Sequence, residues 1–312
     1  MALLTISIPI YNRASYLVRM LERFMLDKSL FDNTIHLFIS DNCSEENLCS
    51  ICNKYQEKGL HLEYSRNGEN LGMDGNFEIC INKGKESDYL WVLGSDDIPT
   101  EGIFDLIIPI LKQGVNSLHL SMSEGESQLV EYSDVIEYLK DINVMITFLS
   151  ANIISSREIS HVDMKKYKNS FFTQMPIYLT TIFTGQKNVM LKCSYLQKGN
   201  DGNNNGGYSF FKVFMDNYFS IWEEFVRKGY LKKSDFEYIK RVTFESFHWG
   251  YVRRTLLGQP SQALDMSGCK ITVLRHFGTK PYLYSHLYQL FMERTRHLIK
   301  IVAHKCKFYS NY

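Results

Sequence analysis

Two adjacent carboxylates, Asp96 and Asp97, follow directly after an apolar run in the sequence. Residues 89–93 read Tyr-Leu-Trp-Val-Leu, which predicts a buried strand, and Pro99 prevents that strand from continuing. Two like charges at the end of a buried strand are unfavourable unless a positive charge binds them. Mg²⁺ and Mn²⁺ bind one or two protein carboxylates and complete their shells with water or phosphate oxygens. The pair therefore predicts a divalent-cation site.

A simpler interpretation of the same two residues stays open. A solvated turn would also accommodate two aspartates, and Asp97 could cap a helix that begins near residues 99–101. The other polar residues that follow predicted strands favour the cation site.

Strands and helices alternate through the first hundred residues. Apolar runs rich in β-branched residues predict strands, and apolar residues every three or four positions predict helices. We expect strands over 3–12, 35–42, 60–66 and 88–94, helices over 16–26 and 47–58, and a Gly-containing loop running into a helix over 70–84. This alternation is typical of βαβ units, which predicts an α/β fold with a mainly parallel, Rossmann-like sheet flanked by helices.

Asn12, Asp41 and Arg66, with Asn70 shortly after it, all fall at or just past the ends of these predicted strands. In open α/β sheets, ligands bind in the crevice at the carboxyl ends of the strands. We therefore expect these side chains and the aspartate pair to face one crevice.

The remaining sequence is less regular. We expect a helix over 103–112, a strand over 117–122 and a helix over 134–142, while 146–156 mixes both patterns and stays unassigned. Residues 198–208 are rich in Gly and Asn and predict a mobile loop, either a lid or a linker. From residue 210 onward the pattern is helical. The last segment, 286–308, combines an apolar face with basic residues, namely Arg294, Arg296, Lys300, Lys305 and Lys307.

The formal net charge of +1 conceals an asymmetry along the chain. Residues 270–312 hold eight basic residues and one acidic residue, Glu293, so this tail carries +7 and the preceding residues carry −6. A basic amphipathic tail suggests contact with anionic lipid, and a core-packing helix with a solvated basic face is the alternative. Because the basic residues are confined to the tail and no recognition motif accompanies them, we expect no nucleic-acid binding.

Seven cysteines form no paired framework. Cys49 and Cys52 are spaced as CxxC, but no second pair of ligands follows, so we expect no zinc site. The odd number of cysteines and an N-terminal apolar stretch too short for a signal peptide predict a reducing, cytoplasmic location. No stretch reaches transmembrane length.

Four motifs in this order and spacing resemble those of family 2 glycosyltransferases of the GT-A fold. They are SIPIYNR at 7–13, ISDNCSEE at 39–46, RNGENLGMDGNFEIC at 66–80 and WVLGSDDIP at 91–99. The resemblance is strong over the first hundred residues and weakens after about residue 160. The last motif is similar to that of bacterial, abequosyltransferase-like enzymes that add sugars to O-antigen or capsule repeat units. The resemblance implies a GT-A fold, here with a helical C-terminal extension.

The resemblance also implies a nucleotide-sugar site. The matching positions are Pro9, Tyr11, Asn12, Arg13, Asp41, Asn70, Gly72, Asn76, Ser95 and Asp96. In relatives, the residue matching Asp41 reads the pyrimidine base. The residues matching Asp96 and Asp97 imply binding of Mn²⁺ or Mg²⁺. Turn, cap or backbone roles stay open for Asn12, Asn70, Asp41 and Gly72.

The sequence departs from the family pattern at two places. Gly94 stands where many relatives carry the first aspartate of the metal motif, so Asp96 and Asp97 are its only carboxylates. Relatives usually place an acidic pair in the acceptor half to supply a general base, but residues 170–179, SFFTQMPIYL, contain no carboxylate. Asp163 is the nearest acid upstream and is the candidate base, with Asp201 and Asp216 as more distant alternatives, and a surface or capping role stays open for each. His161 lies beside Asp163, and we expect it to be exposed and not catalytic.

These expectations define a complete functional hypothesis. Residues 1–209 would form the catalytic domain, with a nucleotide-sugar half over 1–99 and an acceptor half over 100–209. Residues 210–312 would form a helical region with the basic tail. The expected reaction is metal-dependent, inverting transfer of a sugar from a nucleotide-sugar donor, preferably a UDP-sugar, to a glycan acceptor.

The expected acceptor is a lipid-linked repeat unit of lipopolysaccharide O-antigen or capsule, and the expected location is the cytoplasm or the inner face of a bacterial membrane. A catalytically silent glycan-binding relative and a nucleotidyltransferase are the alternatives. A nucleotidyltransferase would need a Gly-rich signature near the N-terminus, and the stretch IPIYNRAS contains no glycine.

Overall fold

The computed structural model describes residues 1–197, 207–259 and 264–309. Packing divides the chain into two compact units, Met1–Gly202 with Asn217–Glu245, and Asn203–Asp216 with Ser246–Tyr312. Residues 217–245 thus pack with the first unit, while the predicted functional boundary at residue 209 stays a prediction. Most of the predicted Gly/Asn loop, residues 198–206, lies outside the described residues.

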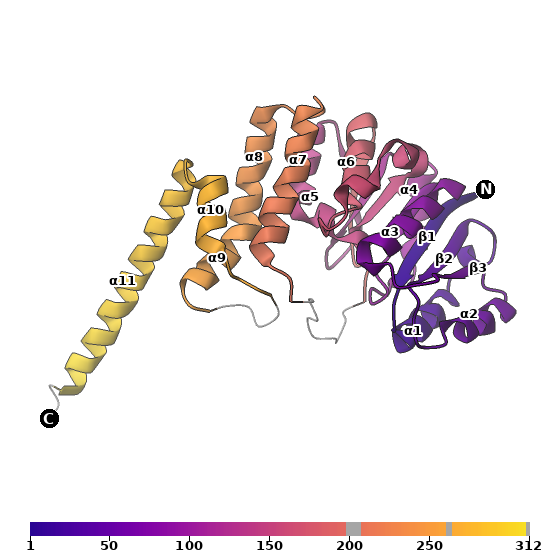
Figure 1. Cartoon of the computed structure of the whole chain (residues 1–312), viewed down its shortest axis with the longest axis horizontal. Coiled ribbons are helices and arrows are strands. Elements are labelled where there is room, and N and C mark those ends of the chain that lie inside the picture. The colour runs from indigo at the N-terminus through magenta and orange to yellow at the C-terminus, as the bar shows by residue number, and fades with distance from the viewer. Residues whose placement is uncertain (198–206, 260–263, 310–312) are drawn as a thin grey trace. The chain divides into compact units, whose positions relative to one another are not determined.

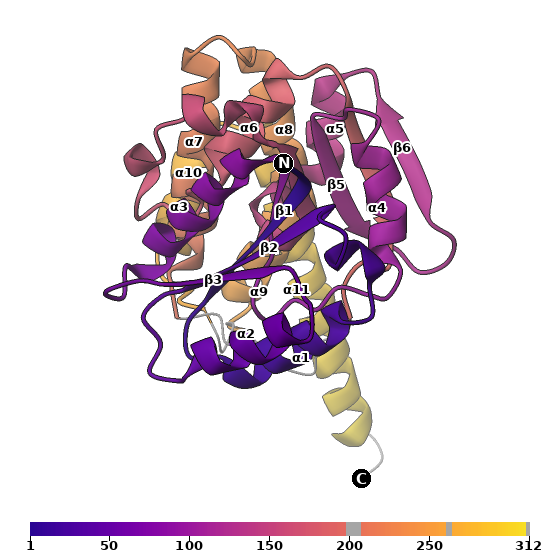
Figure 2. The same cartoon turned by 90° about the vertical axis from the view of Figure 1, so that its right-hand side faces the viewer.

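An eight-stranded sheet, counted over the described residues, forms the centre of the first unit (Figures 1 and 2). Its strand order is β3-β2-β1-β4-β7-β5-β8-β6. The strands are β1 (Ala2–Ile10), β2 (Ile35–Asp41), β3 (Leu62–Arg66), β4 (Ser87–Val92), β5 (Ser117–Met122), β6 (Gln128–Tyr132), β7 (Asn152–Ser155) and β8 (Asn188–Cys193).

The sheet is mainly parallel, as predicted. β1 pairs in parallel with β2 and β4, β2 with β3, and β5 with β8. β7 runs antiparallel between β4 and β5, and β6 runs antiparallel along β8. The parallel half, β3-β2-β1-β4, carries the motifs on which the resemblance rests.

Helices cover both faces of this sheet. The alternating β1 residues Leu4, Ile6 and Ile8 are fully buried and share one core with α1 (Ala14–Phe24), α2 (Leu48–Glu57) and α4 (Ile103–Leu111). α3 (Gly72–Lys83) packs against β1 and β2, and Figure 2 shows it across the strands from α1 and α2. Burial on both faces explains why the strands are continuous apolar runs.

The rest of the first unit consists of helices and short 3₁₀ segments. The α-helices are α5 (Val135–Ile142), α6 (Met175–Thr184), α7 (Tyr218–Arg227) and α8 (Lys233–Thr243). The 3₁₀ segments are η1 (Lys28–Leu30), η2 (Gly84–Glu86), η3 (Asn143–Thr147), η4 (Leu149–Ala151), η5 (Ser156–His161) and η6 (Met164–Tyr167). The unassigned stretch 146–156 thus contains the end of η3, then η4, then the buried strand β7, which accounts for its mixed pattern.

The second unit is held together by aromatic side chains. Phe210 stacks on Tyr251 with ring centroids 4.1 Å apart, and Nε2 of His248 lies 2.7 Å from the carbonyl oxygen of Phe214. Burial lowers the pKa of His248 to about 3. The main helices are α9 (Trp249–Leu256), α10 (Cys269–Phe277) and α11 (Pro281–Tyr309), and π-helical turns occupy Lys212–Asn217 and Phe244–His248. In the part of the chain that the structure describes, no helix has the length and apolarity of a membrane span.

Candidate active site

The four parallel strands bring the predicted residues to one edge of the sheet. Ile10 of β1 is in register with Asp41 of β2, which is in register with Arg66 of β3, and Ser7 is in register with Val92. The loops that follow these strands therefore lie side by side at their carboxyl ends. This is the edge where α/β sheets bind ligands.

Arg13 links the loop after β1 to the loop after β4. Its Nη1 atom lies 3.0 Å from Oδ1 of Asp96 and 3.1 Å from Oγ of Ser95. The Arg13 side chain is 38% exposed and that of Asp96 is 51% exposed. An ion pair this exposed contributes little to stability, so it can open at a small free-energy cost when a ligand arrives.

Asp97 is held differently from its neighbour. Oγ of Ser150 donates a 2.6 Å hydrogen bond to Oδ2 of Asp97 and accepts a 2.9 Å hydrogen bond from the amide nitrogen of Gly94. Burial, reinforced by the charge of Asp96, raises the pKa of Asp97 to about 6, although the hydrogen bond from Ser150 favours the ionised form. Ser150 therefore fixes both the carboxylate and the turn that carries it.

Steric crowding explains why position 94 is a glycine. A Cβ atom on Gly94 would lie 2.7 Å from Oδ2 of Asp97 and 3.3 Å from Oδ1 of Asp96. Both carboxylates thus converge on the space above the Gly94 backbone. Any side chain at position 94 would therefore collide with Asp97 in this arrangement.

We tested this arrangement against the needs of a divalent metal. The half-exposed carboxylate of Asp96 suits a cation held by one protein ligand and completed by substrate phosphates. Asp97 is engaged with Ser150, so its role as a second metal ligand stays a prediction. Among the described residues, the one cluster of three close acids and histidines is His36 with Glu63 and Glu86, and Lys83 already pairs with both glutamates.

Asp41 is fully buried at the end of β2. Its Oδ1 accepts a hydrogen bond from the amide of Ser44 (2.9 Å), and its Oδ2 accepts one from the hydroxyl of Tyr64 (2.5 Å), with Nε of Arg66 at 3.7 Å. Burial and this hydrogen bond raise the pKa of Tyr64 above its usual value. The carboxylate is therefore fixed in position before any ligand binds.

Asn42 organises the loop before α3, and the sequence analysis did not select it. Its Nδ2 donates to Oδ1 of Asn70 (2.8 Å) and to the carbonyl oxygen of Gly72 (3.1 Å). Its Oδ1 accepts from the amide of Leu71 (2.9 Å) and from Nδ2 of Asn67 (3.2 Å). Two features of the sequence could have indicated this role, namely its position directly after Asp41 and the asparagines in residues 66–76.

Asn76 and Asn12 shape the site through contacts with other parts of the protein. Asn76 is buried, and its side-chain amide accepts from Oγ of Ser40 (2.6 Å) and donates to the Ser40 carbonyl oxygen (3.0 Å), which fastens α3 to β2. Asn12 has a φ of 48°, and its Oδ1 accepts from the amide of Glu45 (2.8 Å), which joins the loops after β1 and β2. Gly72 has a φ of +71°, which a glycine adopts without strain.

The two other predicted positions lie on and beside β1. Pro9 is part of β1, in register with Ser40, and is partly exposed. Tyr11 follows the strand with 43% of its surface exposed, so its ring is available to a ligand at this edge.

The structure does not bring Asp163 together with these residues. Ser155, the last residue of β7, is in register with Tyr89 near the start of β4, and η5 then packs against η2 and β4. The chain before Asp163 thus runs to the end of β4 opposite Asp96. Oδ1 of Asp163 accepts a 3.1 Å hydrogen bond from the amide of Lys165, so the side chain caps η6.

The other residues considered beside Asp163 either have contacts away from Asp96 or lie outside the described residues. His161 is 69% exposed and lies 3.2 Å from Glu158, and Asp216 belongs to the second unit, where it contacts Arg275 and His276. Asp201 lies outside the described residues. None of these contacts supports a role in catalysis.

Gln174 directly precedes α6, in the segment 170–179 where the resemblance led us to expect an acidic pair. Its Nε2 donates to the carbonyl oxygen of Thr147 (2.9 Å), while its buried Oε1 has no hydrogen-bond partner among the described residues. This position therefore supplies an amide rather than a carboxylate.

Comparison with known proteins identifies the family. Residues 5–191, more than half of the chain, match the family described as Glycosyl transferase family 2. The chain belongs to this family. The predicted family and its glycosyltransferase enzyme class are thereby confirmed.

A curated relative of this family 2 member is glycosyltransferase GlyG of Streptococcus pneumoniae serotype 4. It is 27% identical over 107 residues, which span 34% of this chain and 34% of GlyG. The matched stretch is thus only about a third of that relative.

Solved glycosyltransferase structures resemble the family 2 chain in fold. TarS of S. aureus (residues 1–349) has a TM-score of 0.59 at 13% identity, covering 80% of this chain and 74% of TarS. The same TarS segment in complex with UDP-GlcNAc gives a TM-score of 0.58 at 14% identity, with coverage of 78% and 71%. Mannosyltransferase PcManGT of Pyrobaculum calidifontis, in complex with GDP-Man and Mn²⁺, gives 0.53 at 11% identity, with coverage of 95% and 86%. The predicted fold class is confirmed.

Proposed function

We propose that this family 2 member transfers a sugar from a nucleotide-sugar donor to a glycan acceptor with the help of a divalent metal. The observation that carries the proposal is the placement of the half-exposed Asp96 carboxylate at the sheet edge that also holds Asp41. Nucleotide sugars bound to TarS and to PcManGT, the latter with Mn²⁺, support this choice of ligands.

Each loop would contact a different part of the donor. The loops around Asp41 and Tyr11 would receive the base, with a uracil base as the preferred candidate. Arg13 would turn from Asp96 to the donor phosphates, because a guanidinium binds phosphate oxygens through paired hydrogen bonds. Asp96 would hold Mn²⁺ or Mg²⁺, which neutralises the diphosphate leaving group when bound.

Several residues would position these groups without contacting the donor's reacting atoms. Ser150 and Asp97 fix the turn that presents Asp96. Asn42 fixes the loop at Asn70 and Gly72, which would lie beside the donor. We assign these residues to positioning because their side chains are hydrogen-bonded to other parts of the protein.

Inverting transfer requires a group that takes the proton of the attacking acceptor hydroxyl. Asp163 remains the predicted base, but its cap on η6 gives that role no geometric support. Gln174, whose Nε2 donates to the carbonyl oxygen of Thr147, offers an amide and no proton-accepting carboxylate on the proposed acceptor side.

The proposed acceptor is a lipid-linked glycan, such as an O-antigen or capsule repeat unit at the inner face of a bacterial membrane. The charge of +7 over residues 270–312 supports contact with an anionic surface. Exposed aromatic side chains on α11, among them Tyr288 and Phe291 at 64% exposure each, support it as well.

The test is release of nucleoside diphosphate from UDP-, GDP-, CDP- and dTDP-sugars in the presence of Mn²⁺. We expect one donor class to be turned over, and Asp96→Asn to abolish the Mn²⁺-dependent part of that turnover. Asp88→Asn, an exposed aspartate on the same strand and loop segment, is the matched control. Pyrophosphate release would instead indicate a nucleotidyltransferase, and no turnover of any donor would indicate a silent glycan-binding protein.

A further inference from the structure

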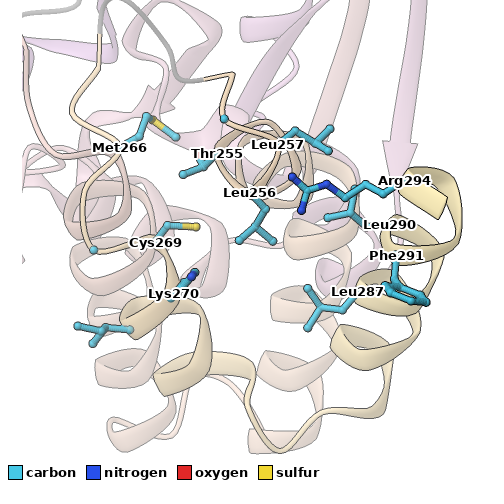
Figure 3. Close-up of a pocket in the computed structure, with 13 residues that line it drawn as sticks. Thr255, Leu256, Leu257, Met266, Cys269, Lys270, Leu287, Leu290, Phe291 and Arg294 are labelled. Carbon is cyan, nitrogen blue, oxygen red and sulfur yellow. The ribbon is translucent and has the colours of Figure 1, made fainter. Parts of the chain in front are cut away.

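The second unit contains an open groove of about 860 Å³. Its walls are the end of α9, the first turn of α10 with the loop before it, and one face of α11. Figure 3 shows Leu287, Leu290 and Phe291 on one side and Met266 and Cys269 on the other, with Leu256 between them. A groove of this size with an apolar lining is typical of sites that bind small molecules or single hydrocarbon chains.

Among the described residues that line this groove, Lys270 and Arg294 are the only charged ones, and none is acidic. Neither side chain forms an ion pair or hydrogen bond with another residue in the described part of the chain. Nearby arginines differ, because Arg253 pairs with Glu293 at 2.8 Å and Arg275 with Asp216 at 3.0 Å. The groove therefore offers two uncompensated positive charges beside apolar walls (Figure 3).

Exposed apolar side chains extend from the groove along α10 and α11. Ile271 and Phe291, which line the groove, are 68% and 64% exposed. Further exposed apolar residues follow at helical spacing, namely Leu274 on α10 and Tyr284, Tyr288 and Ile299 on α11. A patch of this kind on a protein surface marks an interaction site.

We propose that this groove binds a lipid phosphate, with the hydrocarbon chain against the leucines and the phosphate or diphosphate against Lys270 and Arg294. Apolar walls with two unpaired cations complement a molecule that joins a long apolar chain to an anionic group. The exposed apolar residues on α10 and α11 place the mouth of the groove beside a surface suited to lipid. The assignment of this lipid to the glycan acceptor rests on the proposed function. Binding of the lipid to the groove can be measured without any nucleotide-sugar donor.

Charge argues against two other occupants. A second copy of the chain seated on the same face would bring two sets of unpaired cations together, which is unfavourable. A bilayer surface alone would engage the exposed aromatic rings but would leave the interior of the groove without a partner. A single anionic lipid would place its hydrocarbon chain against the apolar walls and its charged group against the two cations.

The experiment measures binding of three probes to the full chain in neutral detergent, by isothermal titration calorimetry. The probes are a long-chain prenyl monophosphate, the prenol of the same chain length, and inorganic phosphate. Hydrogen bonds to charged groups correspond to about tenfold in affinity each, so we expect prenyl phosphate to bind about a hundredfold more tightly than prenol. Inorganic phosphate should bind more weakly than prenyl phosphate by at least the same factor.

Matched variants locate the binding. The double variant Lys270→Ser/Arg294→Gln should reduce prenyl phosphate binding to the level of prenol, while Arg296→Gln, an exposed arginine on the same helix outside the groove lining, should leave it within twofold. Ile271→Ser/Phe291→Ser should weaken both lipids about tenfold, and Leu274→Ser should not. All of the substituted side chains are exposed, so we expect every variant to fold.

Several outcomes would overturn the proposal. These are equal affinity for prenol and prenyl phosphate, equal losses in the control variants, or no binding of either lipid. Self-association that Phe291→Ser abolishes would assign the face to a second copy. Lipid binding without turnover of any nucleotide sugar would count against the proposed function alone, and turnover without lipid binding would count against the groove alone.

Discussion

Nη1 of Arg13 lies 3.0 Å from Oδ1 of Asp96, so a guanidinium pairs with the carboxylate that we propose as the metal ligand. Under the proposed function, a divalent metal would compete with Arg13 for Asp96, and a donor diphosphate would favour the exchange by attracting Arg13. The Arg13–Asp96 ion pair is therefore the state that we expect before the metal and the donor bind.

Replacing Arg13 tests this competition. Arg13→Gln removes the competing charge, so affinity for Mn²⁺ without donor should rise several-fold, whereas affinity for the nucleotide sugar should fall about tenfold because a phosphate contact is lost. Free Mn²⁺ can be followed by electron paramagnetic resonance, and donor binding by calorimetry. Arg19→Gln, on the exposed side of α1, serves as the control. Unchanged Mn²⁺ affinity in Arg13→Gln would refute the competition.

Gly94 should not tolerate a side chain while Asp97 is in place. Gly94→Ala puts a Cβ 2.7 Å from Oδ2 of Asp97, so we expect a loss of about 1–3 kcal/mol in the free energy of unfolding. Combining it with Asp97→Ala should recover most of this loss, because the colliding oxygen is gone. Denaturant unfolding measures all three variants.

Gly68→Ala is the control for this series, since nothing lies within 4 Å of the added Cβ and the backbone needs no positive φ. If the Gly94→Ala and Asp97→Ala effects simply add, the steric explanation of Gly94 is wrong.

Asp97 should make stability depend on pH. Its pKa of about 6 lies above the ordinary 3.8, so between these values the folded state holds more protons than the unfolded state. Stability contributed by the protonated form is therefore lost as the pH rises from about 4 to 6. Asp97→Asn should remove this loss of about 1–3 kcal/mol, measured by denaturant unfolding across that range.

The control for the pH series is Asp105→Asn, an exposed aspartate on α4. A difference between wild type and Asp97→Asn that is the same at pH 4 and pH 7 would show that Asp97 titrates normally.

Asn42 should matter for both stability and donor binding. Asn42→Ala removes four hydrogen bonds from a buried residue and leaves their partners unsatisfied, so we expect a loss of about 2–4 kcal/mol and weaker donor binding. Asn53→Ala, exposed on α2, should change neither. Full donor affinity in Asn42→Ala would mean that the loop at Asn70 and Gly72 does not touch the donor.

Sequence patterns predicted the part of the site that depends on strand order. Asp41 and Asp96 follow strands with strong apolar patterns, and parallel pairing places their ends at one edge, so their proximity could be foreseen. Ser150 could not, because it reaches Asp97 from 53 positions further along the chain, through a segment whose short elements gave a mixed pattern.

The directions of side chains and of short strands could not be predicted from the sequence. Asn76 was predicted at the donor loop and lies there in sequence, but its amide is buried against Ser40. Asp163 was selected as the nearest acid, yet β7 runs antiparallel to β4 and carries the chain to the other end of that strand. Neither the inward turn of a side chain nor the reversal of a four-residue strand leaves a periodic signal.

The central claim is that Asp96 joins a divalent metal to the donor diphosphate. The most direct measurement is a crystal structure of the full chain with UDP and Mn²⁺, using anomalous scattering to locate the metal. We predict a manganese ion about 2 Å from a carboxylate oxygen of Asp96 and from the diphosphate, with Arg13 released towards the phosphates. Bound UDP with the Arg13–Asp96 pair intact and no manganese at Asp96 would contradict the account.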